Sequence, residues 1–429
     1  MGNMLKSLLL LFFLGFSTAV NGAATRTCTI SPLGKGKDDT DQVLKAIDEC
    51  GKNGRTVLQK GNYNITRKMT WNLENAQVDL YGTLNFVPNI EYWLDMTNTY
   101  QVVFIQSQSS WFVLTGKDFV VDAHNEGGIE GNGQPWWEYF QSHTREDGDG
   151  RPLSLTVFEA ERGTVRNFRI QSPPFWCNCV ANSKDVLYDG MICNATNTNP
   201  AFFGENITPN TDGIDTYRSD SITLRNWDVT CGDDCLAIKG NSTNIVAQGI
   251  TCRGGNGIAF GSLGQYVQFN DIVDNVLLED INVLRIDESI QPLMRWGVYF
   301  KSWTGSVIGV PPTGGGGSGG FVKNVVAKNV HLSSVDTAVA AYQTYGGNSS
   351  DTPSFFNFRD LTFEDWSGTA STNTLVDLEC SANAPCSNIS FKNLNVKTPN
   401  NETPNFVCVN VESESGLPGP CNPTPTTTV

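Results

Sequence analysis

Short runs in which apolar and polar residues alternate recur along the chain after residue 159. Each run places two or three apolar residues at alternate positions, continues with Asn, Asp or Gly, and then alternates again. Alternation over a few residues is typical of short β-strands that bury one face. The runs are centred on Asn167, Gly190, Asn226, Gly249, Asp280, Asn329, Asp360 and Asn393.

This repeat, with a shortest spacing of about 23 residues, predicts a solenoid. A β-sandwich rarely needs eight similar runs, and a propeller blade needs about 40 residues. We therefore predict an all-β, single-domain right-handed parallel β-helix, whose neighbouring strands lie about 4.8 Å apart. Residues 38–54 show helical periodicity, and a helix that begins at Asp39 or Thr40 is expected to cap the N-terminal end of the β-helix.

The N-terminal segment has the features of a secretory signal. Lys6 precedes an apolar run over residues 8–16, and small residues follow over 19–24. The run is shorter than the roughly 20 apolar residues of a membrane span. We predict a signal peptide over residues 1–22, one β-helix domain over 23–429, and a secreted protein that does not enter a membrane.

The cysteines and sequons agree with secretion. Twelve cysteines are an even number, and an oxidising compartment preserves disulfides. Short loops make four pairs plausible, namely Cys28–Cys50, Cys235–Cys252, Cys380–Cys386 and Cys408–Cys421. Asn-x-Ser/Thr sequons, which predict glycosylation, begin at Asn64, Asn194, Asn206, Asn241, Asn348, Asn388 and Asn401. The three histidines of the chain argue against a zinc site.

Composition removes two further classes. The formal charge of −15 and a pI near 4.6 exclude a nucleic-acid binder, which needs a basic surface to neutralise phosphates. A hydrophobic content of 39 % is too high for a disordered chain and too low for a membrane protein. A soluble protein with a sizeable core remains.

Three acidic residues interrupt the repeat. Asp212 lies in NTDGID (210–215), and Asp233 and Asp234 lie in GDDC (232–235). The two motifs are about one repeat apart, so their carboxylates are expected on the same face of adjacent coils. Carboxylates that are close together repel, and at least one pKa should rise. One protonated and one ionised carboxyl group are what glycoside hydrolysis requires.

Other interpretations of these aspartates stay open. They could simply cap turns, or they could bind calcium in a lyase that acidifies a sugar proton. The acidic stretch 146–150 also resembles a calcium loop but is expected to be a solvated surface loop. Neighbouring residues of a regular strand face opposite sides. The backbone must therefore turn or bulge if Asp233 and Asp234 both reach one groove.

Four motifs in this order and spacing resemble the signature series of the polygalacturonase family, glycoside hydrolase family 28. They are NTDGID (210–215), GDDC (232–235), GGNGIAFGSLG (254–264) and GVYFKSW (297–303). Upstream, GIEGNGQPWWEYF (128–140) resembles the first-coil segment of that family, and the similarity extends from about residue 28 to about residue 410.

The resemblance implies an inverting hydrolase of pectin without a metal or other cofactor. By position, Asp233 corresponds to the general acid, and Asp212 and Asp234 to the pair that positions and deprotonates the attacking water. The residues expected to bind substrate are Asn210, Asn256, Tyr299, Lys301 and Tyr345. Inverting enzymes usually hold acid and base about 6.5–9.5 Å apart, and we expect neighbouring coils to supply this gap. The partner is then a pectic polysaccharide or oligosaccharide, and the protein is expected to be a monomer.

Two residues depart from the family pattern. Asn256 stands where the family has the histidine of Gly-His-Gly, and Tyr299 stands where it has the arginine of Arg-Ile-Lys, while Lys301 is kept. Tyr cannot replace the bidentate grip of Arg on a carboxylate. Tyr299 is expected either to lie on the surface without a role or to stack on a less charged sugar. Tyr345 resembles a late subsite tyrosine of the family, and Tyr342 competes for that role.

These departures resemble the fungal exo-acting, rhamnogalacturonan-directed branch of the family. The predicted function is release of terminal galacturonosyl or rhamnosyl units from rhamnogalacturonan, with insertions near 196–209 and 306–320 closing one end of the groove. One alternative is an exo-polygalacturonase, a galacturonan 1,4-alpha-galacturonidase, on homogalacturonan. Two further alternatives are a non-catalytic pectin-binding β-helix and a calcium-dependent lyase.

Overall fold

The computed structural model describes residues 26–143, 150–306, 319–345 and 352–423. In these ranges, 25 strands form one continuous sheet in which all pairs are parallel, and the hairpin of β6 and β7 is antiparallel. The predicted fold class, an all-β right-handed parallel β-helix, is confirmed. The predicted signal peptide lies outside the described residues, and the boundary at residue 23 stays a prediction.

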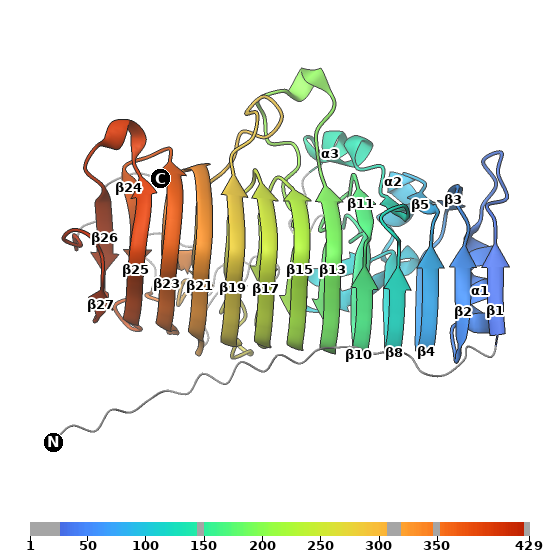
Figure 1. Ribbon diagram of the computed structural model, residues 1–429, viewed down its shortest axis with the longest axis horizontal. Helices are drawn as coiled ribbons and strands as arrows, with labels where there is room; N and C mark the ends of the chain where they lie inside the picture. Colours follow the sequence, from blue (N-terminus) through green and yellow to red (C-terminus); the bar gives the residue numbers. More distant parts are fainter. Residues whose placement is uncertain (1–25, 144–149, 307–318, 346–351, 424–429) are drawn as a thin grey trace.

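The strands form three stacks. The first, whose members stand side by side in chain order (Figure 1), contains β1 (Arg26–Ile30), β2 (Gly54–Leu58), β4 (Met69–Leu80), β8 (Phe112–Asp122), β10 (Leu155–Arg166), β13 (Lys184–Asn194), β15 (Asp220–Thr230), β17 (Ser242–Arg253), β19 (Ile272–Leu284), β21 (Gly320–Val335), β23 (Phe356–Ala370), β25 (Ser387–Lys397) and β27 (Glu414–Ser415). The second contains β12 (Asn178–Ala181), β14 (Ile214–Tyr217), β16 (Asp234–Ile238), β18 (Gly257–Leu263), β20 (Trp296–Trp303), β22 (Thr337–Tyr345), β24 (Thr374–Glu379) and β26 (Asn405–Val409). The third contains β3 (Asn62–Ile65), β5 (Thr83–Phe86), β9 (Gly128–Glu130) and β11 (Arg169–Gln171).

Smaller elements decorate this core. They are β6 (Tyr100–Val103), β7 (Gln108–Ser110), α1 (Thr40–Cys50), α2 (Ile90–Trp93), α3 (Gln134–Phe140) and the 3-10 turns η1 (Met96–Asn98), η2 (Ile105–Ser107), η3 (Pro200–Phe202) and η4 (Pro399–Asn401). None of the helices in the described ranges has the length and apolar character that crossing a bilayer requires.

The centres of the sequence repeat form a column of left-handed backbone. Their φ angles lie near +50 to +70°, a region that Asn, Asp and Gly tolerate best. One of the eight predicted centres, Asp360, does not lie in this column. It belongs to a neighbouring column, where Asn388 Nδ2 donates to Asp360 Oδ1 at 2.6 Å, and Asp365 occupies the position expected for Asp360. Asn393 Nδ2 donates to Asp365 Oδ1 at 2.7 Å. Because both columns carry Asn and Asp, alternation alone does not decide the register.

The predicted capping helix is α1, which packs against β1, β2 and β4 at the N-terminal end (Figure 1). It buries one apolar face that includes Val43 and Ile47. Asp39 precedes the helix but does not cap it through its side chain. Instead its carboxylate accepts hydrogen bonds from the backbone N–H of Leu33 (2.8 Å) and of Asn64 (2.9 Å), which ties the helix entrance to the first coil.

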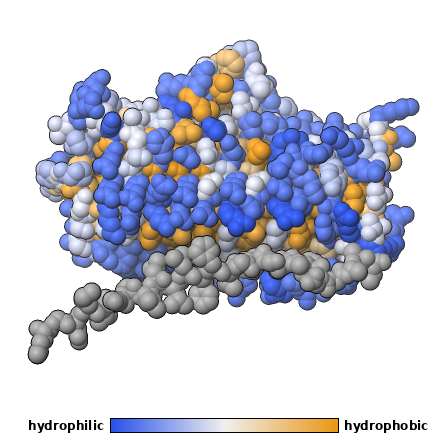
Figure 2. All heavy atoms as spheres, in the orientation of Figure 1, coloured by the Kyte–Doolittle hydropathy of each residue, from blue (hydrophilic) through white to orange (hydrophobic). Residues whose placement is uncertain are grey.

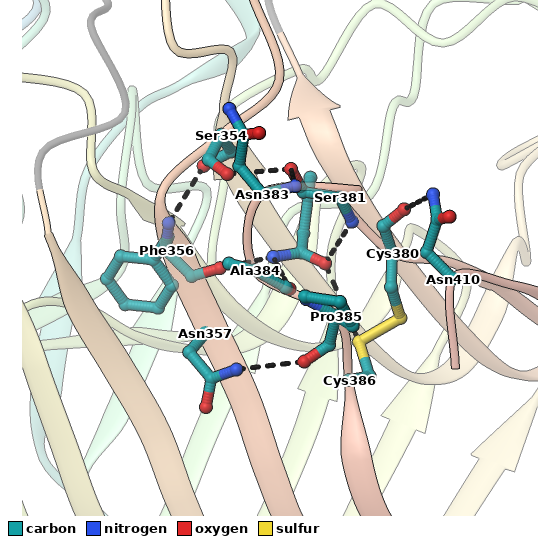
Figure 3. Close-up of a disulfide and its surroundings, with 11 residues drawn as sticks. Ser354, Phe356, Asn357, Cys380, Ser381, Asn383, Ala384, Pro385, Cys386 and Asn410 are labelled. Carbon is teal, nitrogen blue, oxygen red and sulfur yellow. Dashed lines mark hydrogen bonds between the residues drawn. A yellow bond between two sulfur atoms is a disulfide. The ribbon is translucent and has the colours of Figure 1, made fainter. Parts of the chain in front are cut away.

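The four disulfides predicted from loop length are all present, together with Cys177–Cys193. Cys380–Cys386 closes a small loop near the C-terminal end (Figure 3), where Asn357 Nδ2 donates to the carbonyl of Pro385 at 2.9 Å. The remaining two cysteines, Cys179 and Cys231, are buried and free.

The outer face of the first stack is mostly hydrophilic, with hydrophobic residues in bands and in the loops that project beyond β13 (Figure 2). These loops include η3 and the segment before β20, which meet through a hydrogen bond of 2.7 Å from Gly204 N–H to the carbonyl of Ser289. The projecting loops therefore support one another beside the turns that carry the acidic motifs.

Candidate active site

The outer face of the second stack forms the floor of the candidate site. Inward residues of its strands, such as Ile238, Phe260 and Phe300, belong to the main core. Alternate residues therefore face outward. The outward row in register across six coils is Asp215, Ala237, Ala259, Tyr299, Ala340 and Asp377.

A β-bulge lets both aspartates of the GDDC motif, Asp233 and Asp234, reach this face, as the sequence analysis predicted. The register between β16 and β18 shifts between Asp234 and Leu236, and both Cys235 and Leu236 are buried in the core. Strict alternation from the outward residue Ala237 would point Asp234 inward. Because the bulge adds one inward residue between them, Asp234 points outward instead. Asp233 lies one residue earlier, in the turn between β15 and β16.

Asp212, Asp233 and Asp234 meet in one cluster. One carboxylate oxygen of each lies within 4.8 Å of the others, and Asp212 and Asp234 are only 3 % and 1 % exposed. The expected gap of about 6.5–9.5 Å between acid and base is therefore wrong for these oxygens. Residues at matching positions of neighbouring coils inherit the strand separation of about 4.8 Å.

Three N–H groups converge on the Asp233 carboxylate. Oδ2 accepts from the backbone N–H of Asn210 at 3.0 Å and from its Nδ2 at 3.4 Å, and Oδ1 accepts from Asn256 Nδ2 at 2.8 Å. Burial, followed by the charge of Asp234, raises the pKa of Asp233, while these hydrogen bonds and Lys301 act in the opposite direction. A half-buried carboxyl group with a raised pKa is suited to carry a proton.

Gly255 explains why Asn256 comes so close. Its φ is +78°, and a Cβ atom there would lie 2.2 Å from the carbonyl oxygen of Asp233. Only glycine fits at this approach. The backbone N–H of Asn256 can then donate to the same carbonyl at 2.7 Å, which places its side chain beside the carboxylate.

Two buried donors hold Asp234. The hydroxyl of Tyr299 donates to Oδ1, and Lys301 Nζ donates to Oδ2 at 3.0 Å and to the Tyr299 hydroxyl at 2.9 Å. Tyr299 is 2 % exposed, so the expected surface position is wrong. The bulge that turns Asp234 outward carries it into contact with β20, which sequence alternation does not reveal.

Asp212 keeps a free acceptor. Its Oδ1 is buried and has no hydrogen-bond partner among the described residues. Burial, then the charges of Asp215, Asp233 and Asp234, raise the pKa of Asp212 well above its usual value. A buried oxygen without a partner between other carboxylates is a natural place for a reacting water.

Sequence reasoning missed three residues around the cluster. Asp215 is fully buried, its pKa is raised to about 7 by burial, and it forms an ion pair with Lys239 at 3.1 Å. Arg151, 2 % exposed, donates to the side-chain oxygen of Asn210 at 3.2 Å, which orients the amide nitrogen toward Asp233. Arg151 lies outside every motif, so no sequence signal could have found it.

Of the two tyrosines of β22 that were candidates for a sugar subsite, the structure describes the side chain of Tyr342 only. Tyr342 is half-buried and donates from its hydroxyl to Asp377 Oδ2 at 3.2 Å. Its ring lies 6.0 Å from that of Trp296, on the same face as Tyr299. Tyr345 ends the strand, and its side chain lies outside the described part of the chain.

A second hydrophobic cluster, here called the wall, covers the outer face of β12 and the end of β14. Gln106 N–H donates to the Tyr266 hydroxyl at 2.8 Å and joins two of its segments. The wall reaches the acidic cluster, because Lys239 Nζ lies 4.8 Å from the centre of the Trp176 ring. Its buried members are Val102, Val103, Ile105, Val113, Leu153, Phe175, Trp176, Cys179, Ala181, Tyr217 and Tyr266.

Two insertions are predicted to close one end of the groove, and the structure describes only the first of them in full. Segment 196–209 contacts the turn that carries Asp233, where Asn206 Nδ2 donates to the carbonyl of Gly232 at 2.8 Å. Segment 306–320 lies almost wholly outside the described residues, as do 146–149 of the acidic stretch. The wall lies on the N-terminal side of the carboxylates, because it covers β12 and the end of β14, which precede β16 in the second stack.

The three aspartates also have the spacing of metal ligands. However, the Lys301 ammonium and the N–H groups of Asn210 and Asn256 already point at two of them. The ammonium supplies positive charge, and the neutral amides supply hydrogen bonds, where a cation would otherwise bind. The arrangement is therefore better suited to carboxyl groups that give and accept protons than to calcium, which prefers six to eight oxygen ligands.

Comparison with known proteins agrees with this geometry. The family model described as "Glycosyl hydrolases family 28" matches residues 72–417. The chain is 41 % identical over 437 residues to "Putative galacturan 1,4-alpha-galacturonidase A" of Aspergillus niger, covering 96 % of this chain and 97 % of that protein. It is 34 % identical to "Alpha-L-rhamnosidase rgxB" of Aspergillus niger, covering 93 % and 91 %.

A solved structure shares the fold. The endo-xylogalacturonan hydrolase of Aspergillus tubingensis superposes with a TM-score of 0.76 at 22 % identity, covering 92 % of this chain and 99 % of that one. At this identity the match supports the β-helix alone. The family model and the two relatives span the acidic motifs as well.

Proposed function

The chain belongs to glycosyl hydrolase family 28, and from this membership and the site we propose a secreted, inverting, exo-acting hydrolase of the pectin backbone. It removes terminal galacturonosyl or rhamnosyl units from rhamnogalacturonan. The single observation that carries the proposal is the cluster of Asp212, Asp233 and Asp234, in which one carboxyl group is surrounded by N–H donors and another keeps a free buried oxygen.

The proposed reaction needs one proton donor and one acceptor. Asp233 gives its proton to the glycosidic oxygen as the bond from the anomeric carbon to that oxygen breaks. A water held between Asp212 and Asp234 attacks the anomeric carbon from the opposite side, and its proton passes to Asp212. In total, the anomeric carbon loses its bond to the glycosidic oxygen and gains one to the water oxygen, and its configuration is inverted. Asp233 ends ionised, a state that the Asn210 and Asn256 donors stabilise.

The wall supports exo action. An endo-acting enzyme needs a groove that is open on both sides of the cleaved bond. Here the outward residues Cys179 and Tyr217 are buried under the wall, directly before the coil that carries Asp234. A polymer can then extend in one direction only, and the site accepts a chain end.

The released sugar is the finer part of the proposal. One relative is named a galacturonidase and another a rhamnosidase, so similarity alone supports either unit. Tyr299 in place of the family arginine removes one cation from the floor, which favours a backbone with fewer carboxylates over homogalacturonan. Release of galacturonate from homogalacturonan is the alternative.

Secretion is inferred from the disulfides. Five are present among the described residues, and disulfides persist in oxidising compartments. The signal peptide over residues 1–22 is part of the same inference. Monomeric behaviour also remains a proposal.

Product analysis tests the proposal. The protein is incubated separately with rhamnogalacturonan oligomers and oligogalacturonides, and products are followed by chromatography and by NMR of the first-formed anomer. Early release of one monosaccharide with inverted configuration from the alternating polymer is expected. Monomer from oligogalacturonides instead supports the alternative substrate, and mixed oligomers contradict exo action. Turnover by Asp233→Asn equal to that of the wild type overturns the mechanism.

A further inference from the structure

Tyr299 lies directly between a half-exposed aromatic residue and a proposed catalytic carboxylate. Its hydroxyl donates to Asp234 Oδ1, and its ring stacks on Trp296 with 4.2 Å between centroids. The same hydroxyl accepts from Lys301 Nζ at 2.9 Å. The phenol therefore makes one donated and one accepted hydrogen bond in a nearly water-free space.

The two oxygens of Asp234 are held by different groups. Tyr299 holds Oδ1 and Lys301 holds Oδ2 at 3.0 Å, and both come from β20 while Asp234 starts β16. One strand that is distant in sequence thus fixes this carboxylate in both position and rotation. Burial, then the charge of Asp234, raises the pKa of Tyr299 well above its usual value, so the phenol stays a donor throughout the working pH range.

We propose that Tyr299 is a positioning residue for Asp234, rather than a contact for the sugar. Together with Lys301 it holds the Asp234 carboxylate in the orientation in which it faces the reacting water, and Trp296 fixes the ring from the other side. The inference rests on the proposed function for the role of Asp234, but it assigns Tyr299 a task that the hydrolysis mechanism alone does not require.

This arrangement also gives different roles to Asp212 and Asp234, the two carboxylates proposed to contact the water. Both oxygens of Asp234 are engaged, and an ammonium group compensates its charge. Asp212 instead keeps a buried oxygen without a partner in the described residues. Asp234 orients the water while Asp212 accepts its proton.

Tyr299→Phe distinguishes a positioning role of Tyr299 from a role in packing alone, because only a positioning role depends on the hydroxyl. Tyr299→Phe keeps the ring on Trp296 and removes only the hydroxyl. We expect kcat to fall about 10- to 100-fold with KM within twofold, as when an orienting partner of a functional ligand is removed. The acid limb of the pH profile of kcat, which reports the coupled carboxylates together, should move to higher pH, because removing a donor from this negatively charged cluster favours its protonated form. Substrates are those that the wild type hydrolyses in product analysis.

The matched control is Tyr63→Phe. Tyr63 is also fully buried and donates from its hydroxyl to the carbonyl of Ile30 at 2.9 Å, far from the acidic cluster. It should lower the melting temperature and leave kcat and the pH profile unchanged. Equal kcat and equal pH profiles for folded Tyr299→Phe and wild type overturn the proposal.

The pH readout depends on several neighbours. The charged and titratable groups that interact with Asp234, Tyr299 and Lys301 are Asp212, Asp215, Cys231, Asp233 and Lys239. Because these groups titrate together, the profile reports the cluster. A direct readout is therefore the carboxyl NMR signal of Asp234 in protein labelled with carbon-13 aspartate. It should shift in Tyr299→Phe, and an unchanged signal contradicts the contact.

The NMR measurement also separates two failures. If the wild type hydrolyses no pectic substrate, the proposed function fails, while the Asp234 signal still decides whether Tyr299 holds that carboxylate. If Tyr299→Phe does not fold, 3-fluorotyrosine at position 299 keeps the shape and gives a stronger donor. The acid limb must then move to lower pH, and movement in the other direction overturns the proposal.

Discussion

The side-chain amide of Asn256 donates a hydrogen bond of 2.8 Å to Oδ1 of Asp233. This contact joins a residue that departs from the family pattern to the proposed general acid. The glycine-rich turn before β18 and the β15–β16 turn carry the two residues on adjacent coils. Asn256 is therefore a donor to the ionised acid, which forms once the leaving group has taken the proton.

Asn256→Asp tests this contact with little change of shape. The variant replaces the donor by a second negative charge, which should raise the pKa of Asp233 further. We expect kcat to fall by roughly 10-fold or more and the alkaline limb of the pH profile to move to higher pH. Asn132→Asp, which removes a 3.0 Å hydrogen bond to Asn85, is the control away from the site. An unchanged alkaline limb would contradict the assignment of Asp233.

Opening the wall should change the products. Tyr266→Ala removes the hydroxyl that accepts from Gln106 and part of the cover over β14. We expect disaccharides and trisaccharides to appear beside the monosaccharide at early times, measured by chromatography, with the thermal melt confirming a folded protein. Val267→Ala changes an exposed neighbour of Tyr266 in the same segment and should leave the products unchanged. Exclusive monomer release by folded Tyr266→Ala would show that the wall does not cause exo action.

Stability should depend on pH through the buried aspartates. Burial raises the pKa values of Asp212 and Asp233, and that of Asp215 to about 7. The folded protein then binds more protons than the unfolded chain from about pH 4 up to the raised pKa values, so stability falls as the pH rises through this window. Calorimetry should show a melting temperature that declines between about pH 4 and pH 7.

Asp212→Asn should reduce this decline. The amide has the shape of the carboxyl group but does not ionise, so its benefit should be absent near pH 4 and reach roughly 2–4 °C near pH 7. The same variant should lose nearly all activity, because Asp212 accepts the proton of water. A melting curve that falls with pH as steeply as that of the wild type would show that Asp212 is ionised at little cost in the folded protein.

Removal of divalent metal should leave the activity intact. Lys301 and the Asn256 amide point at the carboxylates, so proton transfer needs no calcium. Activity after incubation with a chelator should equal that of untreated enzyme, and products should not absorb in the ultraviolet as unsaturated sugars do. Loss of activity that calcium restores, together with such absorbance, would favour the lyase mechanism.

Much of the architecture follows from local sequence. Alternation and the Asn, Asp and Gly columns are sufficient to predict a parallel β-helix, because each coil repeats the same strand and turn chemistry. The capping helix over Thr40–Cys50 and four disulfides follow from short-range patterns. The spacing of Asp212 and Asp233 is likewise enough to predict that they lie on adjacent coils.

The tertiary structure alone decided what surrounds those carboxylates. Tyr299 and Lys301 are far from Asp234 in sequence, and they reach it only because a bulge turns Asp234 outward and two coils place β20 beside it. Arg151 reaches the site from outside every motif. Repeating patterns encode contacts that recur in each coil, whereas these unique long-range contacts depend on which side chains the stacked coils bring into one buried space.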